Sequence, residues 1–278
     1  MKLKTLVHLI GLRPRPREYG HEIRTFSLPD DGPIEYAQWL HPAESPKSYT
    51  QAEVDHLRTF LAPGDVAIDI GAHTGDTTLP IALAVGPTGR VLALEPNPYV
   101  YRVLKVNAGL NAGKTVIEPL PFAATPADGP IEFEYSDPGF CNGGRHQGIH
   151  VLRHGHAFKK TVQGRHLESY LREERSDLIP RIRYVKTDAE GYDAAVLGSL
   201  RGLLAEVRPY IKAEVYKHTS HRQRLELFQM LRGLGYQVRL IKSHLEYFGP
   251  VLDDSQLMDR RHYDILCVPN EQRTALSA

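Results

Sequence analysis

The stretch VAIDIGAHTGD, residues 66–76, decides the fold of this chain. Its first five residues are apolar except for Asp69, which is the pattern of a short buried strand. Gly71 and Gly75 follow, and glycine lets the backbone turn tightly and come close to a ligand. A predicted helix over residues 77–85 begins directly after them, and a helix N-terminus carries unpaired N–H groups. A strand, a glycine turn and a helix in this order predict a ligand site at the edge of an α/β sheet.

A single carboxylate marks the end of the next predicted strand. Residues 91–94 are apolar, and Glu95 follows them, 20 residues after Gly75. A carboxylate at this place in a nucleotide-binding sheet meets the ribose hydroxyls of a bound nucleoside. Three residues separate Gly71 from Gly75, whereas a dinucleotide site has the spacing Gly-x-Gly-x-x-Gly, so no pyrophosphate site is predicted. This spacing disfavours a nicotinamide-dependent dehydrogenase. The alternative is a tight turn beside a solvated Glu95.

Strands and helices alternate along most of the chain. The predicted strands are residues 66–70, 91–94, 116–117, 184–187, 210–215, 236–241 and 263–268. The predicted helices among them are residues 77–85, 98–108, 193–204 and a segment around Leu225, Phe228 and Leu231. Such alternation is typical of a parallel sheet with helices on both faces. It predicts an α/β fold with a doubly wound, seven-stranded, mostly parallel sheet whose last strand is antiparallel.

Residues 1–48 are predicted to be an extension that precedes the main domain of residues 49–278. The extension starts with a helix whose apolar face carries Leu3, Leu6, Val7 and Ile10. No small-residue cleavage site follows this helix, so we do not expect a signal peptide. We expect it to pack on the body of the protein or on a second subunit of a homo-oligomer; a membrane-surface anchor is the alternative. Alternating residues between 21 and 40 predict a β-hairpin.

The composition excludes several classes of protein. The chain has 278 residues, of which 41% are hydrophobic, and 34 basic against 33 acidic side chains leave a net charge of +1. This length supports a large core, and the balanced charge argues against a protein that coats nucleic acid. Only two cysteines occur, far apart, so no disulfide framework is predicted. No apolar run approaches the roughly 20 residues of a membrane span. We therefore expect a cytoplasmic protein without a transmembrane segment.

The segment KTDAEG, residues 186–191, follows the fourth predicted strand and carries two carboxylates. If the backbone stays extended there, Asp188 and Glu190 point to the same side, because their spacing is two residues. Such a pair can accept a proton from a substrate hydroxyl, bind a divalent cation or polarise an acceptor. The alternative role for one of them is to cap the next helix.

Further polar residues follow the fifth predicted strand on the same edge of the sheet. They are Glu214, Tyr216 and His218. His218 is a candidate general base, because the ordinary pKa of histidine is about 6.5. A surface histidine at a helix start is the alternative.

Residues 128–165 interrupt the alternation of strands and helices and are predicted to be an insertion that covers the functional edge. The insertion contains one stretch of alternating apolar and polar residues, 131–135. The insertion contains four histidines close together, namely His146, His150, His154 and His156. Zinc needs three or four ligands with convergent geometry, and the segment is rich in glycine without a cysteine pair, so no metal site is predicted. We expect a lid over the acceptor, with residues 141–144 as its flexible part.

Two of these segments together resemble a known family. DIGAxxG (residues 69–75) followed by EPNP (residues 95–98) resembles the cofactor site of class I S-adenosylmethionine-dependent methyltransferases. The further presence of GRV (residues 89–91) and KxDxEG (residues 186–191) resembles the FkbM-type branch, as do Asn107, Asn111 and Glu214. The resemblance covers roughly residues 45–270. The chain departs from the pattern at His73, where asparagine is usual, and at Thr125 and Glu168, where the family often has aspartate.

The resemblance implies S-adenosylmethionine as the cofactor and a set of residues that hold it. Those implied for the methionine portion are Asp69, Gly71, Ala72, Thr74 and Gly75. Glu95 would hold the ribose, Pro96 and Asn97 would flank the adenosine, and Ala123 would border the adenine. Asp188, Glu190, Glu214 and His218 are the candidate catalytic residues, and a divalent cation beside the carboxylates is left open.

The resemblance also implies the reaction. We expect O-methylation of a sugar, or of a glycosylated or polyketide-like small molecule, by in-line displacement at the methyl carbon. The residues alone do not separate O- from N-methylation. The alternatives are a nucleic-acid methyltransferase, which the balanced charge disfavours, a nicotinamide-dependent dehydrogenase, and a non-catalytic scaffold that keeps only the fold.

Overall fold

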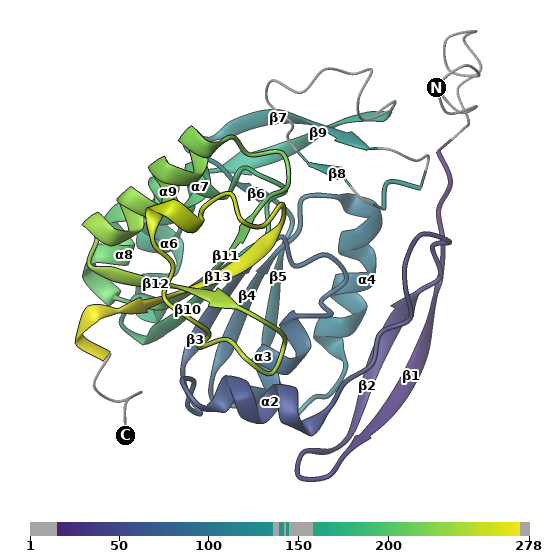
Figure 1. The fold of residues 1–278 in the computed structure, drawn as a ribbon. Coiled ribbons are helices and arrows are strands. Elements are labelled where there is room, and N and C mark those ends of the chain that lie inside the picture. Colours follow the sequence, from purple (N-terminus) through teal and green to yellow (C-terminus); the bar gives the residue numbers. More distant parts are fainter. Residues whose placement is uncertain (1–15, 136–138, 142, 145–157, 273–278) are drawn as a thin grey trace, which may run out of the picture.

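A computed structural model describes residues 16–135, 139–141, 143–144 and 158–272 (Figure 1). The predicted N-terminal helix and the four clustered histidines of the insertion lie outside these residues. Within the described part of the chain, no helix is both long and apolar enough to cross a membrane.

A seven-stranded sheet forms the centre of the molecule, with the strand order β12-β13-β11-β10-β3-β4-β5. Its strands are β3 (Val66–Ile70), β4 (Arg90–Leu94), β5 (Ile117–Leu120), β10 (Ile182–Thr187), β11 (Tyr210–Val215), β12 (Tyr236–Ile241) and β13 (Tyr263–Pro269). The five strands from β11 to β5 pair in parallel, and β13 is antiparallel to both of its neighbours. The predicted doubly wound sheet with an antiparallel last strand is therefore confirmed.

The central strand β3 is buried on both faces, because alternate residues point into two separate apolar clusters. Ile68 packs into one cluster and Ala67 into the other. The first cluster lies under α6 (Leu167–Glu174), α7 (Asp193–Ser199), α8 (Arg201–Val207) and α9 (His221–Gly233). The second lies under α2 (Gln51–Arg58), α3 (Thr78–Val85) and α4 (Pro98–Gly109) (Figure 1). This two-sided cover explains why the sequence of β3 is almost continuously apolar.

The predicted hairpin is confirmed as β1 (His21–Leu28) paired with β2 (Gly32–Trp39). It lies against α4, where Asn107 Oδ1 accepts a hydrogen bond from the Ala37 N–H at 2.6 Å. The Tyr36 hydroxyl lies 2.6 Å from Thr74 Oγ1 in the glycine turn. The hairpin thus supports the turn after β3 from outside.

The insertion builds a second sheet, with the strand order β6-β9-β7-β8. Its strands are β6 (Ala123–Ala124), β7 (Gly129–Tyr135), β8 (Gly143–Gly144) and β9 (Phe158–Arg165), and β7 pairs with β9 in antiparallel fashion. The sequence predicted only the alternating stretch in β7. It missed β9 because Lys159 and Lys160 give that strand a polar composition.

Two other predictions about helices differ from the structure. The single helix predicted over residues 193–204 is two short helices, α7 and α8, which are separated at Leu200. The sequence also missed α6 and the 3₁₀ turns η1 (Ser176–Arg181) and η2 (Asp254–Gln256). A capping box begins α2, since Thr50 accepts from the Glu53 N–H and the Glu53 carboxylate accepts from the Thr50 N–H.

Candidate functional site

A cavity of about 280 Å³, here the first cavity, lies where β3, β4 and β10 end. Its lining consists of Glu44 and Lys47 before α2; Ile70, Gly71, His73, Asp76 and Thr77 after β3; Leu94, Glu95, Pro96, Asn97 and Val100 after β4; Phe122, Ala123, Ala124, Ile131, Phe133, Tyr135 and Cys141 in and around the insertion; and Lys186, Asp188, Ala189, Glu190, Tyr192 and Val196 after β10. The cavity brings together predicted residues from both motifs, namely Gly71, Glu95, Pro96, Asn97, Ala123, Asp188 and Glu190.

The glycine turn after β3 is tied to both neighbouring loops. Gly71 has a positive φ of +77°, and a Cβ at this position would lie 2.2 Å from the Asp188 carbonyl oxygen. The N–H groups of Gly71 and Ala72 both donate to the Leu94 carbonyl, at 3.1 and 2.9 Å. The Asp188 N–H donates to the Ile70 carbonyl at 3.0 Å. Glycine is therefore required at position 71 by the close approach of two loops.

Asp69 lies beneath the first cavity and does not line it. Its Oδ1 accepts from Lys186 Nζ at 2.8 Å, and its Oδ2 accepts from the hydroxyls of Thr77 and Thr78 at 3.1 and 2.7 Å. Asp69 and Lys186 are almost fully buried. Asp69 thus joins β3, β10 and the start of α3.

Three further predicted cofactor residues also lie behind the wall of the first cavity. The side chains of Ala72 and Thr74 are fully buried, and Gly75 has a φ of +90°. The Thr74 carbonyl accepts from Asn107 Nδ2 at 2.7 Å. These residues shape the turn, while their neighbours His73 and Asp76 reach the cavity.

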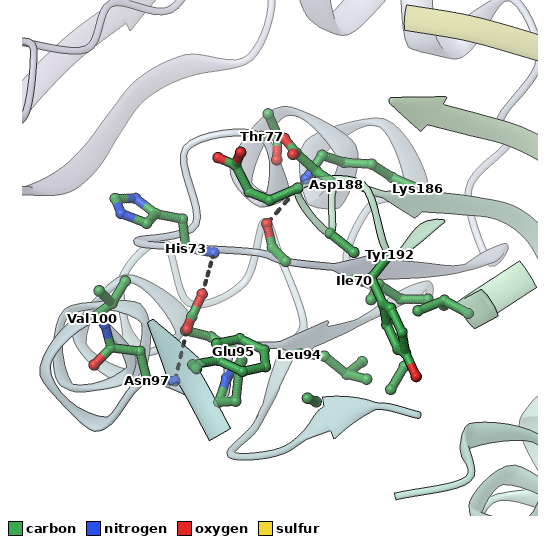
Figure 2. Close-up of a pocket in the computed structure, with 18 of the residues that line it drawn as sticks. Ile70, His73, Thr77, Leu94, Glu95, Asn97, Val100, Lys186, Asp188 and Tyr192 are labelled. Carbon is green, nitrogen blue, oxygen red and sulfur yellow. Dashed lines mark hydrogen bonds between the residues drawn. The ribbon is translucent and has the colours of Figure 1, made fainter. Parts of the chain in front are cut away.

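Glu95 enters the first cavity from the end of β4 in a fixed orientation (Figure 2). One carboxylate oxygen accepts from the His73 N–H at 3.1 Å, and the other accepts from the Asn97 N–H at 2.8 Å. Each oxygen keeps a second lone pair that can accept from a ligand hydroxyl. Burial raises the pKa of Glu95, although the nearby His73 and the two backbone N–H groups lower it in part.

Apolar side chains form the wall of the first cavity beside Glu95. They are Phe122, Ile131, Phe133 and Tyr135, mostly from β7. Asn97 closes this side: its side chain caps α4 by accepting from the Tyr99 N–H and donates to the Phe140 carbonyl at 2.7 Å. A flat aromatic base can lie against such a wall. The alternation of β7 residues was visible in the sequence, but nothing there placed β7 beside β4.

Asp188 and Glu190 both line the first cavity, but the extended backbone predicted for them is wrong. β10 ends at Thr187, and Glu190 and Gly191 have positive φ values of +51° and +95°. The turn is stabilised by Asp193, whose Oδ1 accepts from the Thr187 hydroxyl at 2.9 Å and from the Ala189 N–H at 3.3 Å. Asp193 therefore holds the turn that carries Asp188 and Glu190, and no side-chain hydrogen bond caps the N-terminus of α7.

Crowding of carboxylates changes their proton affinity at this edge. Burial, followed by repulsion from Asp188, raises the pKa of Glu190 and raises the pKa of Asp193 to about 7. The same two causes, burial first and Asp188 second, raise the pKa of Glu214 far above that of an ordinary carboxyl. Raised pKa values of this kind are typical of groups that exchange protons near neutral pH.

Glu214 and His218 line a second cavity of about 510 Å³ and do not reach the first. Glu214 Oε1 lies 3.5 Å from His262 Nε2, and within the described residues its buried Oε2 has no hydrogen-bond partner. The His218 ring lies 5.4 Å from the ring of Tyr216. Glu190 and Tyr192 line both cavities, so Glu190 stands where the two meet.

Sequence reasoning missed several charged residues of the first cavity. Lys47 pairs with Asp76 at 2.7 Å and with Glu44 at 2.9 Å. Burial opposes the charge of Asp76, but Lys47 and His73 outweigh it and lower the pKa of Asp76. Asp76 ends the stretch that decides the fold, which was the available signal. Nothing in the sequence pointed to Glu44 or Lys47, because the fold alone brings them to this edge.

Among solved structures, the methyltransferase FkbM from Methylobacillus flagellatus KT is similar to this chain, with 16% identity and a TM-score of 0.46. The similarity covers 75% of this chain and 44% of that one, so the chain spans less than half the length of that protein. Fibrillarin from Aeropyrum pernix, solved with S-adenosyl-L-methionine, has 13% identity and a TM-score of 0.44, with 92% and 98% of the two chains covered.

A third similar structure is an O-methyltransferase from Thermotoga maritima, described as dependent on S-adenosylmethionine. It has 12% identity and a TM-score of 0.44, with 90% of this chain and 78% of that chain covered. None of the curated proteins matches the chain.

The family described as the methyltransferase FkbM domain matches residues 69–238, more than half of the 278 residues. The match begins at Asp69 and runs through both motifs into β12. The chain therefore belongs to the FkbM methyltransferase domain family, as its two motifs predicted.

Proposed function

We propose that this protein transfers a methyl group from S-adenosylmethionine to a hydroxyl of a small molecule, most favourably a sugar or a glycosylated compound. The observation that carries the proposal is the carboxylate of Glu95. Two backbone N–H groups hold it in a cavity at the carboxyl edge of the sheet, and Asp188 and Glu190 line the same cavity. Ligands of open α/β sheets bind at this edge.

The first cavity fits the chemical parts of the cofactor. Glu95 offers two oxygens to the ribose hydroxyls, and the apolar wall of Phe122, Ile131 and Phe133 suits the adenine. Pro96, Asn97 and Ala123 flank the same region. Gly71 permits close approach, while Asp69, Ala72, Thr74 and Gly75 hold the shape of the turn. When bound, the cofactor supplies a methyl group made electrophilic by its sulfonium.

The chain's own contribution is to orient the acceptor and to take its proton. Holding an acceptor oxygen in line with the methyl carbon is worth about 7–11 kcal/mol, and a positioned base adds about 10²–10⁴-fold. As the acceptor oxygen bonded to the methyl carbon, the methyl–sulfur bond would break and the sulfur would leave as a neutral thioether, while the hydroxyl proton would pass to a carboxylate at the junction of the cavities. Glu190 suits this role because its raised pKa brings it closer to neutral pH. His218 is the second candidate base.

The second cavity is the proposed acceptor site. Polar groups at one end, namely Glu214, Tyr216, His218 and Gln223, can bind several hydroxyls, while Leu227 and Met230 are apolar. Because its pKa is far above 7, Glu214 is protonated at neutral pH and can donate a hydrogen bond to an acceptor oxygen. These features favour a polyhydroxylated acceptor over a nucleic acid, for which the net charge of +1 also offers little attraction.

A divalent cation at Asp188 and Glu190 is a competing mechanism for the same reaction. Within the described residues, these carboxylates do not gather with a third ligand at metal-site spacing. We therefore propose base catalysis without a metal at this place. Activity that a chelator abolishes and magnesium restores would favour the cation instead.

The test is a titration followed by a transfer assay. Calorimetry with S-adenosylmethionine should show binding to one site per chain, and the same titration with NAD should show none. A panel of sugars and amines is then incubated with methyl-labelled cofactor, and label should appear on hydroxylated acceptors. Binding of NAD alone would support the dehydrogenase alternative. Cofactor binding without transfer to any acceptor class would support the scaffold.

A further inference from the structure

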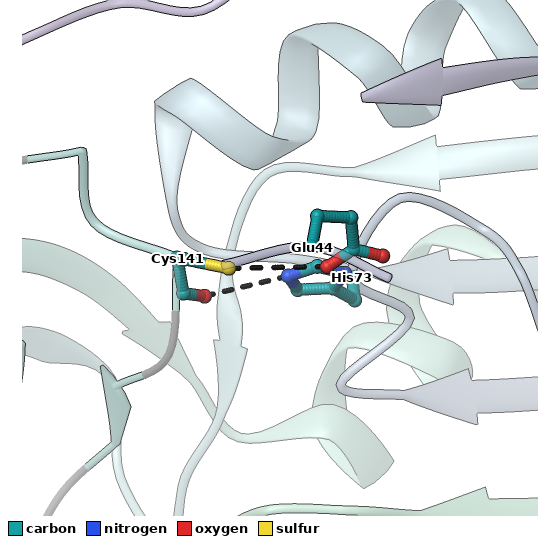
Figure 3. A group of neighbouring side chains, drawn as sticks. All are labelled: Glu44, His73 and Cys141. Carbon is teal, nitrogen blue, oxygen red and sulfur yellow. Dashed lines mark hydrogen bonds between the residues drawn. The ribbon is translucent and has the colours of Figure 1, made fainter. Parts of the chain in front are cut away.

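Three side chains that commonly ligate metals meet at the rim of the first cavity (Figure 3). Glu44 lies in the link between β2 and α2, His73 in the glycine turn, and Cys141 in the insertion. Their potential ligand atoms all lie within 4.8 Å of one another. The Cys141 thiol already points at Glu44, with Sγ 3.8 Å from Oε2.

The Glu44 carboxylate is buried and incompletely satisfied. Its side chain is only 7% exposed, and within the described residues its Oε1 accepts no hydrogen bond. The Lys47 ammonium lies 2.9 Å from this oxygen and forms an ion pair with it. Lys47 also pairs with Asp76 at 2.7 Å, so it keeps a partner if another cation takes Glu44.

The His73 imidazole is held in place on two sides. Its Nε2 lies 3.3 Å from the Cys141 carbonyl oxygen, and its ring meets the Trp39 ring edge-on at 5.9 Å. The family resemblance leads one to expect asparagine at position 73. The histidine of this cluster is therefore not part of the family pattern. Nothing in the proposed methyl transfer uses a thiol or an imidazole at this position.

We propose that Glu44, His73 and Cys141 bind a zinc ion, with the fourth position of the ion facing the first cavity. Zinc prefers this mixture of sulfur, nitrogen and oxygen ligands, and three protein ligands with an open fourth position are typical of zinc sites that accept an outside ligand. Cys141 loses its thiol proton to solvent when the Zn–S bond forms. The thiolate and carboxylate then balance the charge of the ion.

The geometry needs only a small contraction. Zn–S and Zn–N bonds of about 2.3 and 2.1 Å in a tetrahedron separate the ligand atoms by roughly 3.4–3.7 Å. The distance from Cys141 Sγ to Glu44 Oε2 is already 3.8 Å. Rotation of the His73 ring away from the Cys141 carbonyl frees Nε2 for the ion.

Cobalt(II) is the probe, because it occupies zinc sites and reports its ligands by absorption. The metal-free full-length protein is titrated with Co²⁺, and we expect one equivalent to give the intense bands of a tetrahedral site together with a thiolate charge-transfer band in the near ultraviolet. Zn²⁺ should displace the cobalt and bleach both. The cobalt titration does not measure methyl transfer, so its result tests the zinc site independently of the proposed function.

Variants assign the ligands. Cys141→Ser should abolish the charge-transfer band. Glu44→Gln and His73→Asn should each weaken Co²⁺ binding at least about tenfold, because even loss of a partner that only orients a metal ligand has an effect of this size. The matched controls are Cys267→Ala, at the other cysteine, and His244→Asn, at an exposed histidine; both should titrate like the parent. Circular dichroism confirms that each variant is folded.

Three results would overturn the proposal. They are the absence of a tetrahedral cobalt spectrum in the parent, a charge-transfer band that survives Cys141→Ser, and unchanged affinity in folded Glu44→Gln and His73→Asn. The last result would assign Cys141 to a different set of ligands.

Discussion

Lys186 Nζ donates a hydrogen bond to Asp69 Oδ1 at 2.8 Å, and both side chains are almost fully shielded from water. Burial by itself would lower the pKa of Lys186, but the carboxylates of Asp69, Asp188 and Asp76 together outweigh it and raise that pKa. Lys186 therefore stays charged in the lining of the first cavity. The ion pair joins the two sequence motifs that indicated the family, because Asp69 belongs to the first (residues 69–75) and Lys186 to the second (residues 186–191).

The first prediction concerns that pair. Asp69→Asn leaves the Lys186 ammonium buried without its counter-charge, which typically costs about 3–5 kcal/mol. Urea unfolding should show this loss, and the double variant Asp69→Asn, Lys186→Met should recover part of it. Lys159→Met, which breaks an exposed pair with Glu132, is the control and should leave the midpoint almost unchanged. Equal effects of Asp69→Asn and Lys159→Met would contradict a buried, charged pair.

The second prediction concerns cofactor affinity. Glu95→Gln replaces one carboxylate oxygen by an amide nitrogen. This nitrogen donates hydrogen bonds and cannot accept one from a backbone N–H or from a ribose hydroxyl. Hydrogen bonds to a charged group are worth about 1.5–3 kcal/mol, so calorimetry should show S-adenosylmethionine bound roughly 10–100-fold more weakly. The exposed Glu132→Gln serves as the control. Unchanged affinity in Glu95→Gln would remove Glu95 from the ribose role.

The third prediction concerns catalysis. Asp188→Asn keeps the size of the side chain but removes a negative charge from the first cavity, and turnover should fall at least about 10²-fold with cofactor affinity nearly unchanged. Its melting temperature should stay within a few degrees, because the side-chain hydrogen bonds that hold this turn come from Asp193. A capping role for Asp188 would instead cost about 0.5–2 kcal/mol with turnover preserved. Full activity in both Asp188→Asn and His218→Ala would contradict this placement of the active site.

The fourth prediction concerns pH. Burial, with repulsion from Asp188, raises the pKa of Asp193 to about 7 from an ordinary value of 3.8. The folded state therefore holds a proton that the unfolded state has released, so this stabilisation is complete below pH 4 and is lost as the pH rises towards 7. Asp193→Asn keeps the acceptor oxygen and cannot ionise. Thermal melts from pH 4 to 8 should show a weaker decline in the variant; parallel curves would contradict the raised pKa.

The fifth prediction separates steric clash from backbone strain in the glycine turn. Gly113 has a φ of +86° with open space around its Cβ position, whereas the Cβ of residue 71 would lie 2.2 Å from the Asp188 carbonyl oxygen. Gly113→Ala should cost about 1–2 kcal/mol for its left-handed backbone alone. Gly71→Ala should cost clearly more in urea unfolding, because two loops must move apart. Equal losses would show that only the backbone conformation matters.

The succession of strands and helices along the chain could be predicted from the sequence, because hydrophobic alternation and glycine turns are local signals. The cavity wall made by β7 could not be predicted from the sequence. Ile131 and Phe133 lie in β7, which pairs with β9, and the polar composition of β9 gave no sign of a strand. The role of Asp193 in holding this turn was also hidden, because it depends on the positive φ values at Glu190 and Gly191. Glu44 and Cys141 are 97 residues apart, and only the folded chain brings them together.

The hairpin β1–β2 shares its interior with the main sheet. Ile34 and Tyr36 belong to the same apolar cluster as Ala67 and Leu79, and Ala37 is hydrogen-bonded to Asn107 in both directions. A protein shortened to begin after the hairpin would therefore open its core to water on this face and lose the neighbour that fixes Thr74. The boundary predicted at residue 48 is therefore not a place where the chain can be cut without exposing this face.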